Sequence, residues 1–263
     1  MTTIAIHGAG GRMGLRLIAL SSEDDSLELL AAIDRRGHPR AGEDVGALAG
    51  IGLANVKLTD TLAHKVDVLI DFTVPPATRT AIKMCTDLGC HMVIGTTGLS
   101  TDDHRAIDEA SQSIAVLQAP NMSLGINLLL ALAAQVAKKL GDACDIEIVE
   151  THHRFKKDAP SGTALGIAQA ICNAVGKDIE KDVVHGRHGG DMTRTPGQIG
   201  MHALRSGDVV GRHTVSFGAL GEELQLVHIA STRDIFARGA LIAAKWLAQK
   251  PAGRYGMANV LEL

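Results

Sequence analysis

The fifteen residues from Glu150 to Ala164 (ETHHRFKKDAPSGTA) hold the densest group of side chains that could take part in chemistry. His152 and Lys156 can donate protons, and His153 adds an imidazole that is neutral or cationic near neutral pH. The segment therefore combines proton donors with positive charge, a set that suits protonating or holding a small carboxylate.

The elements that must position these side chains can be predicted on both sides of the segment. Asp145–Val149 alternates acidic and branched apolar residues, which is typical of a half-buried strand. Ser161 is a good N-cap for an apolar helix predicted over Ala164–Val175. The backbone N–H groups of Gly162 and Thr163 would then point out of the helix end, where they favour an anion.

Each of these features alone also fits an ordinary structural role. Either histidine could be structural, a pair of lysines is usually a solvated face, and Ser-Gly-Thr after a proline is often plain helix capping. The functional interpretation depends on all of them occurring together.

A second candidate site lies near the start of the chain. A glycine-rich loop follows a short apolar strand over Thr3–Ile6 and precedes a helix predicted over Leu15–Leu20. This order is typical of a dinucleotide-binding fold, in which glycines permit a tight turn and close approach of the pyrophosphate. The spacing is G-x-x-G-x-x-G, a variant of the usual fingerprint. The loop residues expected to contact a cofactor are Gly8, Ala9, Gly10, Gly11, Arg12 and Met13.

The second predicted strand, Leu27–Ile33, strengthens this interpretation. It ends in Asp34 and Arg35, about twenty residues after the loop. Asp34 could accept hydrogen bonds from the adenosine ribose of NAD, and Arg35 could accommodate the extra phosphate of NADP. The pair suggests that either cofactor is tolerated. The structural alternative is a strand that ends in ordinary surface charge.

Strands and helices continue to alternate as far as Gln118, which predicts a mostly parallel sheet with ligands at the carboxyl ends of its strands. The strands are predicted over Val66–Asp71, His91–Ile94 and Ile114–Gln118, and the helices over Thr78–Leu88 and Thr101–Ser111. Two segments at strand ends are candidates to line the nicotinamide half of a cofactor, although the first could also be a simple turn. They are Gly95, Thr96 and Thr97, and Ala119, Pro120, Asn121 and Met122.

A smaller α+β unit is predicted after a long helix over Ser123–Leu140. The segment 184–200 is rich in Gly, His and Arg, and its composition predicts a mobile loop. Three strand-like runs follow and, with Asp145–Val149, predict a mixed four-stranded sheet. The runs are Gly200–Arg205, Val209–Phe217 and Glu223–Ser231, and an amphipathic helix is predicted over Thr232–Gln249.

The predicted fold class is therefore α/β with two domains. Residues 1–122 should form a Rossmann-like dinucleotide-binding domain, and residues 123–231 a smaller α+β domain for substrate binding and oligomerisation. Residues 232–263 are expected to form a C-terminal helix and tail that return to the first domain.

Composition argues against several classes of function. A net charge of −3, the lack of a basic tract and 2% aromatic residues argue against nucleic-acid binding. The four cysteines have no zinc spacing, and His185 and His188 lack a third ligand at a usual spacing, so we expect no metal. We predict no secretory signal and no membrane-spanning segment, and the cysteines fit a reducing, cytoplasmic compartment.

Three motifs in one chain of this length, Gly8–Gly14, Gly95–Gly98 and His152–Thr163, closely resemble those of the dihydrodipicolinate reductase family, also called 4-hydroxy-tetrahydrodipicolinate reductases. The resemblance covers essentially the whole chain in motif order, and the last motif is the most specific. It implies an NAD(P)H-dependent oxidoreductase of lysine biosynthesis through the diaminopimelate pathway. Such an enzyme reduces 4-hydroxy-tetrahydrodipicolinate to tetrahydrodipicolinate with loss of water.

The resemblance also implies roles for residues in the last motif. His152 would be the catalytic acid–base and Lys156 the proton donor, while His153, Gly162 and Thr163 would bind the substrate. After loss of water, hydride reaches C4 of a conjugated imine. The negative charge that develops on the ring nitrogen and the neighbouring carbon must then be neutralised by a proton.

For the cofactor, NADH or NADPH, the resemblance implies contacts with the glycine loop, Asp34, Gly95–Thr97 and Ala119–Met122, and with Arg35 in the case of NADPH. Family members commonly form homotetramers through the sheet of the second domain, and we expect the same here.

Two other classes of function remain open from the sequence. Another NAD(P)-dependent enzyme, such as an amino-acid dehydrogenase, would share the glycine loop but not the His152–Thr163 motif. A non-catalytic nucleotide-sensing module would bind NAD and a partner, but it would leave His152 and Lys156 without a role.

Overall fold

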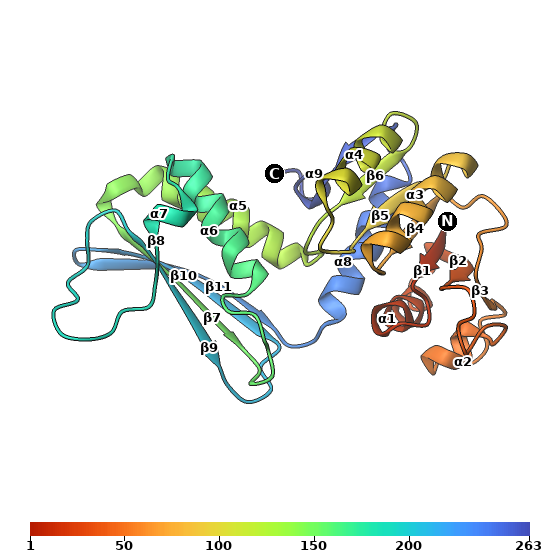
Figure 1. Ribbon diagram of the computed structural model, residues 1–263, viewed down its shortest axis with the longest axis horizontal. Coiled ribbons are helices and arrows are strands. Elements are labelled where there is room, and N and C mark those ends of the chain that lie inside the picture. Colours follow the sequence, from red (N-terminus) through yellow and green to blue (C-terminus); the bar gives the residue numbers. More distant parts are fainter. The chain divides into compact units, whose positions relative to one another are not determined.

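The computed structural model describes all 263 residues and divides the chain into two compact units. Unit 1 consists of Met1–Ser123 together with Asp234–Glu262, and unit 2 consists of Leu124–Arg233. Each unit contains one sheet with helices packed on it (Figure 1).

Unit 1 is built on a seven-stranded sheet in the order β12-β6-β5-β4-β1-β2-β3, in which every pairing is parallel. Its central strands are mainly apolar and buried on both sides, as a parallel sheet between two helical layers requires. The strands are β1 (Thr2–His7), β2 (Leu27–Ile33), β3 (Leu58–Thr59), β4 (Val68–Asp71), β5 (His91–Ile94), β6 (Ala115–Gln118) and β12 (Gly253–Tyr255).

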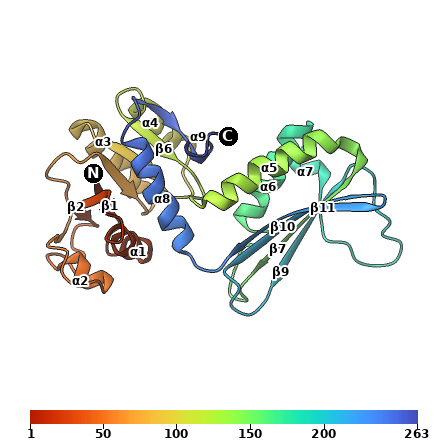
Figure 2. The ribbon, with the colours of Figure 1, turned by 180° about the vertical axis from the view of Figure 1, so that it is seen from behind.

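Helices cover both faces of this sheet (Figures 1 and 2). α1 (Arg12–Ser21) packs beside α8 (Asp234–Leu247), and α3 (Pro75–Leu88) packs beside α4 (Thr101–Ala110). The short helices α2 (Val45–Ala49) and α9 (Met257–Val260) complete the unit. The predicted α/β class, with a parallel sheet in the first part of the chain, is confirmed.

The strand order of unit 1 reverses at β1. β1 lies between β2 and β4, so the chain builds the sheet first to one side of β1 and then to the other. In open sheets of this kind, ligands bind where the strand order reverses, outside the carboxyl ends of the strands. The glycine loop follows β1 at this position.

Unit 2 is built on a five-stranded sheet in the order β11-β10-β7-β9-β8. β7 pairs antiparallel with β10 and parallel with β9, so the sheet is mixed. α5 (Leu124–Leu140) and α6 (Gly162–Val175) pack together over one face, and the opposite face carries no helix (Figure 1). The remaining elements are β7 (Asp145–His152), α7 (Ile179–Asp182), β8 (Val183–His185), β9 (Ile199–Arg205), β10 (Gly211–Ala219) and β11 (Glu222–Ala230).

The predicted four-stranded sheet is wrong by one strand. β8 has three residues, overlaps the segment 184–200 that was predicted to be a loop, and pairs parallel with β9. So short a strand shows no sequence pattern, because its pairing comes from the neighbouring strand. The strand predicted over Asp145–Val149 also continues to His152, which moves Glu150 and His152 from the predicted loop onto β7.

α5 is the core helix of unit 2. With the turn after it, residues 124–143 are long and apolar enough to cross a membrane by length and composition. Its buried residues Leu129, Ala133 and Ala137 join the apolar core with α6 and the sheet. The apolar face of this helix is therefore used for packing within the unit.

Candidate active site

The carboxyl end of β7 places a carboxylate and an imidazole on one face. Glu150 and His152 are two residues apart on the strand, so both point to the side that also carries the core residues Ile146 and Ile148. Glu150 is fully buried and His152 is 9% exposed. His152 Nδ1 lies 2.6 Å from Glu150 Oε2. These two buried polar groups, which follow the apolar part of the strand, therefore meet part of each other's need for hydrogen bonds.

Three further hydrogen bonds reach the Glu150 carboxylate. Arg205 of β9 donates from Nη1 to Oε2 (2.9 Å) and from Nη2 to Oε1 (3.0 Å). The backbone N–H of Ser161 donates to Oε1 (3.0 Å). Burial alone would raise the pKa of Glu150, but the hydrogen bonds from Arg205 and His152 outweigh burial and lower it. Glu150 is therefore ionised near neutral pH.

The state of His152 follows from this partner. Burial lowers the pKa of His152 although Glu150 opposes the shift, so the imidazole is mainly neutral near neutral pH. An ionised carboxylate can only accept, so Nδ1 carries the proton and Nε2 presents a lone pair. A Cβ at position 211 would lie 3.2 Å from Nε2, and Gly211 leaves that space free. His152 is thus arranged to act as a base through Nε2.

His213 of β10 stands beside His152, with the ring centroids 5.2 Å apart in an edge-to-face arrangement. Burial and the neighbouring His152 lower the pKa of His213 to about 4, so it is neutral at pH 7. Its Nε2 lies 3.2 Å from the hydroxyl of Ser161, which also accepts a hydrogen bond from the N–H of Ala164. His213 therefore supports the N-cap of α6 without adding charge.

Lys156 lies on the loop between β7 and α6 and is half-buried. Its Nζ donates to Asp158 Oδ1 (2.8 Å), and this bond holds the pKa of Asp158 below its usual range. Arg205 Nη2 donates to the Asp158 carbonyl oxygen (2.6 Å) and so ties the loop to β9. Burial is the main cause that lowers the pKa of His152, and the charge of Lys156 adds to it.

The N-terminus of α6 is the candidate anion site. Ser161 is its N-cap, as predicted. A Cβ at Gly162 would meet no atom within 4 Å, so the first turn faces open space at this point. Thr163 is half-buried next to it. N–H groups in the first turn of a helix lack intrahelical acceptors and favour an anion.

His153, which directly follows β7, forms a polar contact with Arg233. Its Nδ1 is buried without a hydrogen-bond partner, and its Nε2 lies 3.4 Å from Arg233 Nη2. Since a guanidinium group can only donate, Nε2 accepts from Arg233, and Nδ1 is the nitrogen that could donate to a carboxylate ligand. Sequence analysis did not find Arg233, because 80 positions separate it from His153 and only the fold brings the two together. It also missed Arg205 and His213, and it gave Glu150 no role.

In unit 1, the glycine loop after β1 has no room for side chains at its ends. Gly8 has a φ of 81°, and a Cβ there would lie 2.7 Å from the Phe72 carbonyl oxygen. A Cβ at Gly14 would lie 2.2 Å from the carbonyl oxygen of Gly8. No side chain caps α1, so the N–H groups at Arg12 and Met13 are open to an anion. The loop fits the pyrophosphate of a dinucleotide.

Asp34, at the end of β2, also holds the glycine loop. Its Oδ2 accepts a hydrogen bond from the Gly10 N–H (2.9 Å), and its Oδ1 accepts one from the Arg35 N–H (2.8 Å). A carboxylate offers about four acceptor positions, so about two remain for the hydroxyl groups of a ribose. The side chain of Arg35 is exposed.

A second buried carboxylate, Asp71 at the end of β4, joins the loops around this site. It accepts hydrogen bonds from His7 Nδ1 (2.9 Å) and from the hydroxyls of Thr73 (2.7 Å), Thr78 (2.6 Å) and Thr96 (2.9 Å). His7 directly precedes the glycine loop, and Thr96 lies in the loop after β5. Asp71 therefore fixes the spacing of three loops at the carboxyl edge of the sheet. Sequence analysis placed Asp71 only at a strand end.

The loop after β5 is partly used by this network. The Thr96 hydroxyl donates to Asp71 and accepts from the Thr73 N–H (2.9 Å), whereas Thr97 is exposed. A Cβ at Gly95 would lie 2.4 Å from the Phe72 ring, so glycine is needed there. Thr97 and the backbone of the loop are the parts available to a ligand.

The loop after β6 is divided in the same way. Ala119 and Met122 are buried, and the Met122 carbonyl oxygen packs so closely on α8 that a Cβ at Gly239 would lie 1.8 Å from it. Pro120 is exposed and Asn121 is half-buried. Pro120 and Asn121 are therefore the accessible part of the segment.

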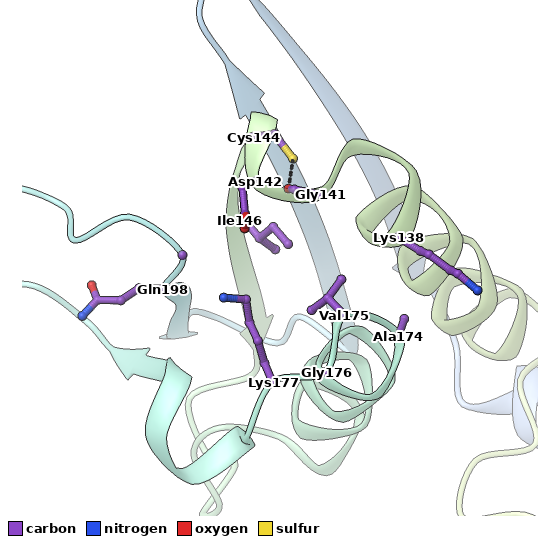
Figure 3. A pocket seen from close by; sticks show the side chains of 11 residues that line it. Lys138, Gly141, Asp142, Cys144, Ile146, Ala174, Val175, Gly176, Lys177 and Gln198 are labelled. Atoms are coloured by element: carbon purple, nitrogen blue, oxygen red, sulfur yellow. Dashed lines mark hydrogen bonds between the residues drawn. The ribbon is translucent and has the colours of Figure 1, made fainter.

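None of the predicted site residues lines the pocket of about 440 Å³ in unit 2 (Figure 3). Its lining includes Val175 and Lys177 at the C-terminal end of α6, whereas Gly162 lies at the N-terminal end of the same helix. Lys177 reaches toward Ile146, and Lys138 points away from it (Figure 3). The structure contains no group of three or more His, Cys, Asp or Glu side chains placed to hold a metal ion.

Two family models together match nearly the whole chain. The model described as dihydrodipicolinate reductase, N-terminus, matches residues 2–122, and the model described as dihydrodipicolinate reductase, C-terminus, matches residues 125–261. The 4-hydroxy-tetrahydrodipicolinate reductase of Alkalilimnicola ehrlichii is 47% identical, over 100% of this chain and 99% of its own length.

Solved structures share the fold. A dipicolinate-bound dihydrodipicolinate reductase from Paenisporosarcina sp. TG-14 superimposes with a TM-score of 0.77 at 23% identity, covering 98% of this chain and 99% of that one. An amine dehydrogenase from Mycobacterium smegmatis superimposes with a TM-score of 0.62 at 10% identity, covering 96% of this chain and 94% of that one. The architecture therefore extends to other dehydrogenases, and at these identities the likeness concerns the fold alone.

Replacing Asp71 by alanine tests the network in unit 1. We expect Asp71→Ala to lower the free energy of unfolding by about 2–4 kcal/mol, because buried donors lose their acceptor. We also expect it to weaken NADH binding at least about tenfold, or about 1.4 kcal/mol, because the loops lose their common anchor. Both can be measured on the purified variant, by denaturation and by nucleotide fluorescence.

The control for this experiment is Asp67→Ala. Asp67 lies near the opposite end of β4, where it accepts hydrogen bonds from the N–H and hydroxyl of Thr3 at an exposed position. Its removal should leave NADH binding unchanged. Equal weakening of NADH by the two variants would contradict the role given to Asp71.

Proposed function

The chain belongs to the dihydrodipicolinate reductase family, and from this premise we propose how its side chains carry out the NAD(P)H-dependent reduction of 4-hydroxy-tetrahydrodipicolinate in lysine biosynthesis. One observation carries the proposal: His152 Nδ1 is hydrogen-bonded to Glu150, which leaves Nε2 as the reactive nitrogen. The reaction needs a group that first takes a proton and then returns it, and an imidazole held in this way can do both.

His152 acts as base and then as acid. Neutral Nε2 takes a proton from the ring carbon next to C4 as the hydroxyl group leaves C4, which gives the conjugated imine. Glu150 stabilises the imidazolium that forms. After C4 has been reduced, the imidazolium returns its proton to the same ring carbon, and His152 is neutral again.

Lys156 protonates the departing hydroxyl group, so that it leaves as water. Solvent returns this proton to Lys156 before reduction, and the restored ammonium group lowers the energy of the negative charge that spreads onto the ring nitrogen when C4 is reduced. Asp158 holds Nζ by a 2.8 Å hydrogen bond. Over one turnover, solvent returns one proton to Lys156 and one water is released.

The two carboxylates of the substrate bind at two places in unit 2. One accepts hydrogen bonds from the N–H groups of Gly162 and Thr163. The open space at Gly162 supports this assignment. The other binds His153 and Arg233, and the unpaired Nδ1 of His153 supports this assignment. Unit 2 is on this account the substrate-binding domain.

Unit 1 is on the same account the dinucleotide-binding domain. The pyrophosphate binds the glycine loop and the N-terminus of α1, and Asp34 binds the adenosine ribose. Arg35 binds the extra phosphate of NADPH, so both NADH and NADPH are accepted. Gly95–Thr97 and Ala119–Met122 line the nicotinamide half through their backbone and their exposed positions. When bound, the reduced dinucleotide supplies the hydride that C4 receives.

In the cell we propose a cytoplasmic homotetramer. The face of the five-stranded sheet that carries no helix exposes Leu204 (51%), Val227 (46%) and Ile229 (62%). Exposed apolar side chains gathered on one sheet face are typical of an interface between protein chains. The four cysteines are free, as expected in a reducing compartment.

Lys156→Ala tests the proton donor. We expect kcat to fall about 100- to 10,000-fold, the usual contribution of general acid catalysis. NADH binding should stay nearly unchanged, because the dinucleotide binds unit 1. The assay follows nicotinamide absorbance, with substrate made in place by the preceding synthase. The exposed neighbour Lys157→Ala is the control and should keep full activity. Equal losses in the two variants, or weakened NADH binding in Lys156→Ala, would count against the role of Lys156.

Asp34→Ala and Arg35→Ala test how the cofactor is recognised. Asp34→Ala should weaken NADH more than NADPH, and Arg35→Ala should weaken NADPH about tenfold with little effect on NADH. Binding constants for both nucleotides with both variants give the comparison. If Asp34→Ala weakens the two nucleotides equally, Asp34 does not bind the ribose.

Val227→Asp tests the assembly. The unaltered protein should sediment at four times the chain mass of 27.6 kDa. A charge at this position of the sheet face should shift the mass to smaller species. Leu53→Asp, an exposed leucine of unit 1 (75%), is the control and should remain tetrameric. A monomeric unaltered protein, or a tetrameric Val227→Asp, would rule out assembly through this face.

A further inference from the structure

Glu150 does not touch the substrate or the cofactor in the proposed reaction, yet it contacts three parts of the site. Its carboxylate touches the imidazole of His152, the guanidinium of Arg205 and the N–H of Ser161. We infer that Glu150 is a positioning residue for the reaction, which selects Nε2 of His152 as the proton-carrying nitrogen and, through the same carboxylate, anchors the start of α6. The inference rests on the proposed function, because it assumes that His152 carries the proton.

The geometry leaves the carboxylate a single orientation. Oε2 faces His152 Nδ1 (2.6 Å) and Arg205 Nη1 (2.9 Å), while Oε1 faces the Ser161 N–H (3.0 Å) and Arg205 Nη2 (3.0 Å). The bidentate pair with Arg205 fixes the plane of the carboxylate. Since Glu150 is fully buried, water does not compete for these positions. The imidazole is thereby held in one tautomer and one orientation.

The charges around His152 show why the reaction needs Glu150. The imidazole contacts Glu150 on β7 itself and His213 on β10, and the charges of Lys156 on the loop and Arg205 on β9 also act on it. Lys156 and Arg205 disfavour a positive charge on His152, and the neutral His213 adds none. Glu150 is the one group of the four that favours the imidazolium. Without it, His152 would be a weaker base.

The bond to Ser161 gives Glu150 its second function. Ser161 is the N-cap of α6, and its N–H would have no helical acceptor without Oε1. The residues that follow, Gly162 and Thr163, carry the proposed carboxylate site. One carboxylate therefore sets the distance between the proton carrier and the substrate anchor.

The chain contains a matched comparison for Glu150. Glu147 lies on the same strand but on the opposite face, where it accepts a hydrogen bond from His202 Nε2 (2.7 Å) and pairs with Arg187 (2.9 Å). It thus has the same types of partner as Glu150. It touches none of the residues assigned to the reaction.

The test compares Glu150→Gln with Glu147→Gln. The amide of Glu150→Gln has one oxygen, which the Ser161 N–H and Arg205 Nη2 both need on the Oε1 side. Its NH₂ group then faces His152 Nδ1 and Arg205 Nη1, so the bidentate pair is lost and the Nε2–H tautomer of His152 is favoured. We expect kcat to fall at least about 100-fold; loss of the carboxylate behind a catalytic histidine costs about 10,000-fold in serine proteases. Dipicolinate binding should weaken several-fold, and NADH binding should not change.

The pH profile separates this role from simple loss of structure. Glu150 raises the pKa of His152 relative to burial alone, so its removal lowers that pKa further. Because His152 must be neutral to act as a base, the acid limb of kcat should move to lower pH in Glu150→Gln. Glu147→Gln should keep kcat, dipicolinate binding and the acid limb of the unaltered protein. An unmoved acid limb in Glu150→Gln would overturn the inference.

The tautomer of His152 can also be measured in the unaltered protein, so this test does not depend on whether a Glu150 variant folds. Nitrogen NMR of labelled histidine, with the His152 signal assigned by its absence from His152→Gln, should show the proton on Nδ1 at neutral pH. A proton on Nε2 would overturn the inference about Glu150 and leave the proposed reaction standing. A tautomer that switches in Glu150→Gln while kcat stays normal would instead show that His152 does not carry the proton, and both proposals would fall.

Discussion

A carboxylate cannot remain charged in a protein interior unless hydrogen bonds and opposite charge compensate for the water it has lost. Glu150 imposes this requirement on unit 2. Its compensation comes from three segments that are far apart in the sequence: the end of β7, the N-cap of α6 and Arg205 on β9. The same contacts bring His152 and the N-cap of α6 together, and Arg205 also donates to the Asp158 carbonyl oxygen on the loop that carries Lys156.

Unit 1 also has a buried, hydrogen-bonded carboxylate at the carboxyl edge of its sheet. Asp71 is fully buried at the end of β4 and pairs with His7, the last residue of β1. Its hydroxyl partners come from the loops after β4 and β5 and from α3. In both units a buried carboxylate next to a histidine lies at the carboxyl end of a strand and fixes flexible loops. Precise loops on a rigid sheet are what binding and catalysis require.

The sequence predicted those parts of the molecule whose pattern is local. The glycine loop, the alternation of strands and helices, and the N-cap at Ser161 each follow from neighbouring residues, and the fold agrees with them. β3, β8 and β12 have two or three residues each, so their pairing depends on the sheet and leaves no pattern in the sequence. Full-length membership of one family also removes the amino-acid dehydrogenase and the sensing module as alternatives.

The site was predictable only as far as one motif reaches. His152, at the end of β7, and Lys156, in the loop after it, belong to one motif. Arg205 lies 55 positions from its partner Glu150, and Arg233 lies 80 positions from its partner His153. Nothing in their local sequence marks them. The spacing of Glu150 and His152 was a signal that could have been read, because an acid two residues before a histidine at a strand end places both on one face.

The most direct test of the account is an experimental structure of the protein with NADH and dipicolinate, a planar dicarboxylate that cannot be reduced in the same way. We expect one carboxylate on the N–H groups of Gly162 and Thr163, with His152 Nε2 facing the ring and Nδ1 still bound to Glu150. Dipicolinate bound away from α6, or a His152 ring turned away from Glu150 in the complex, would contradict it.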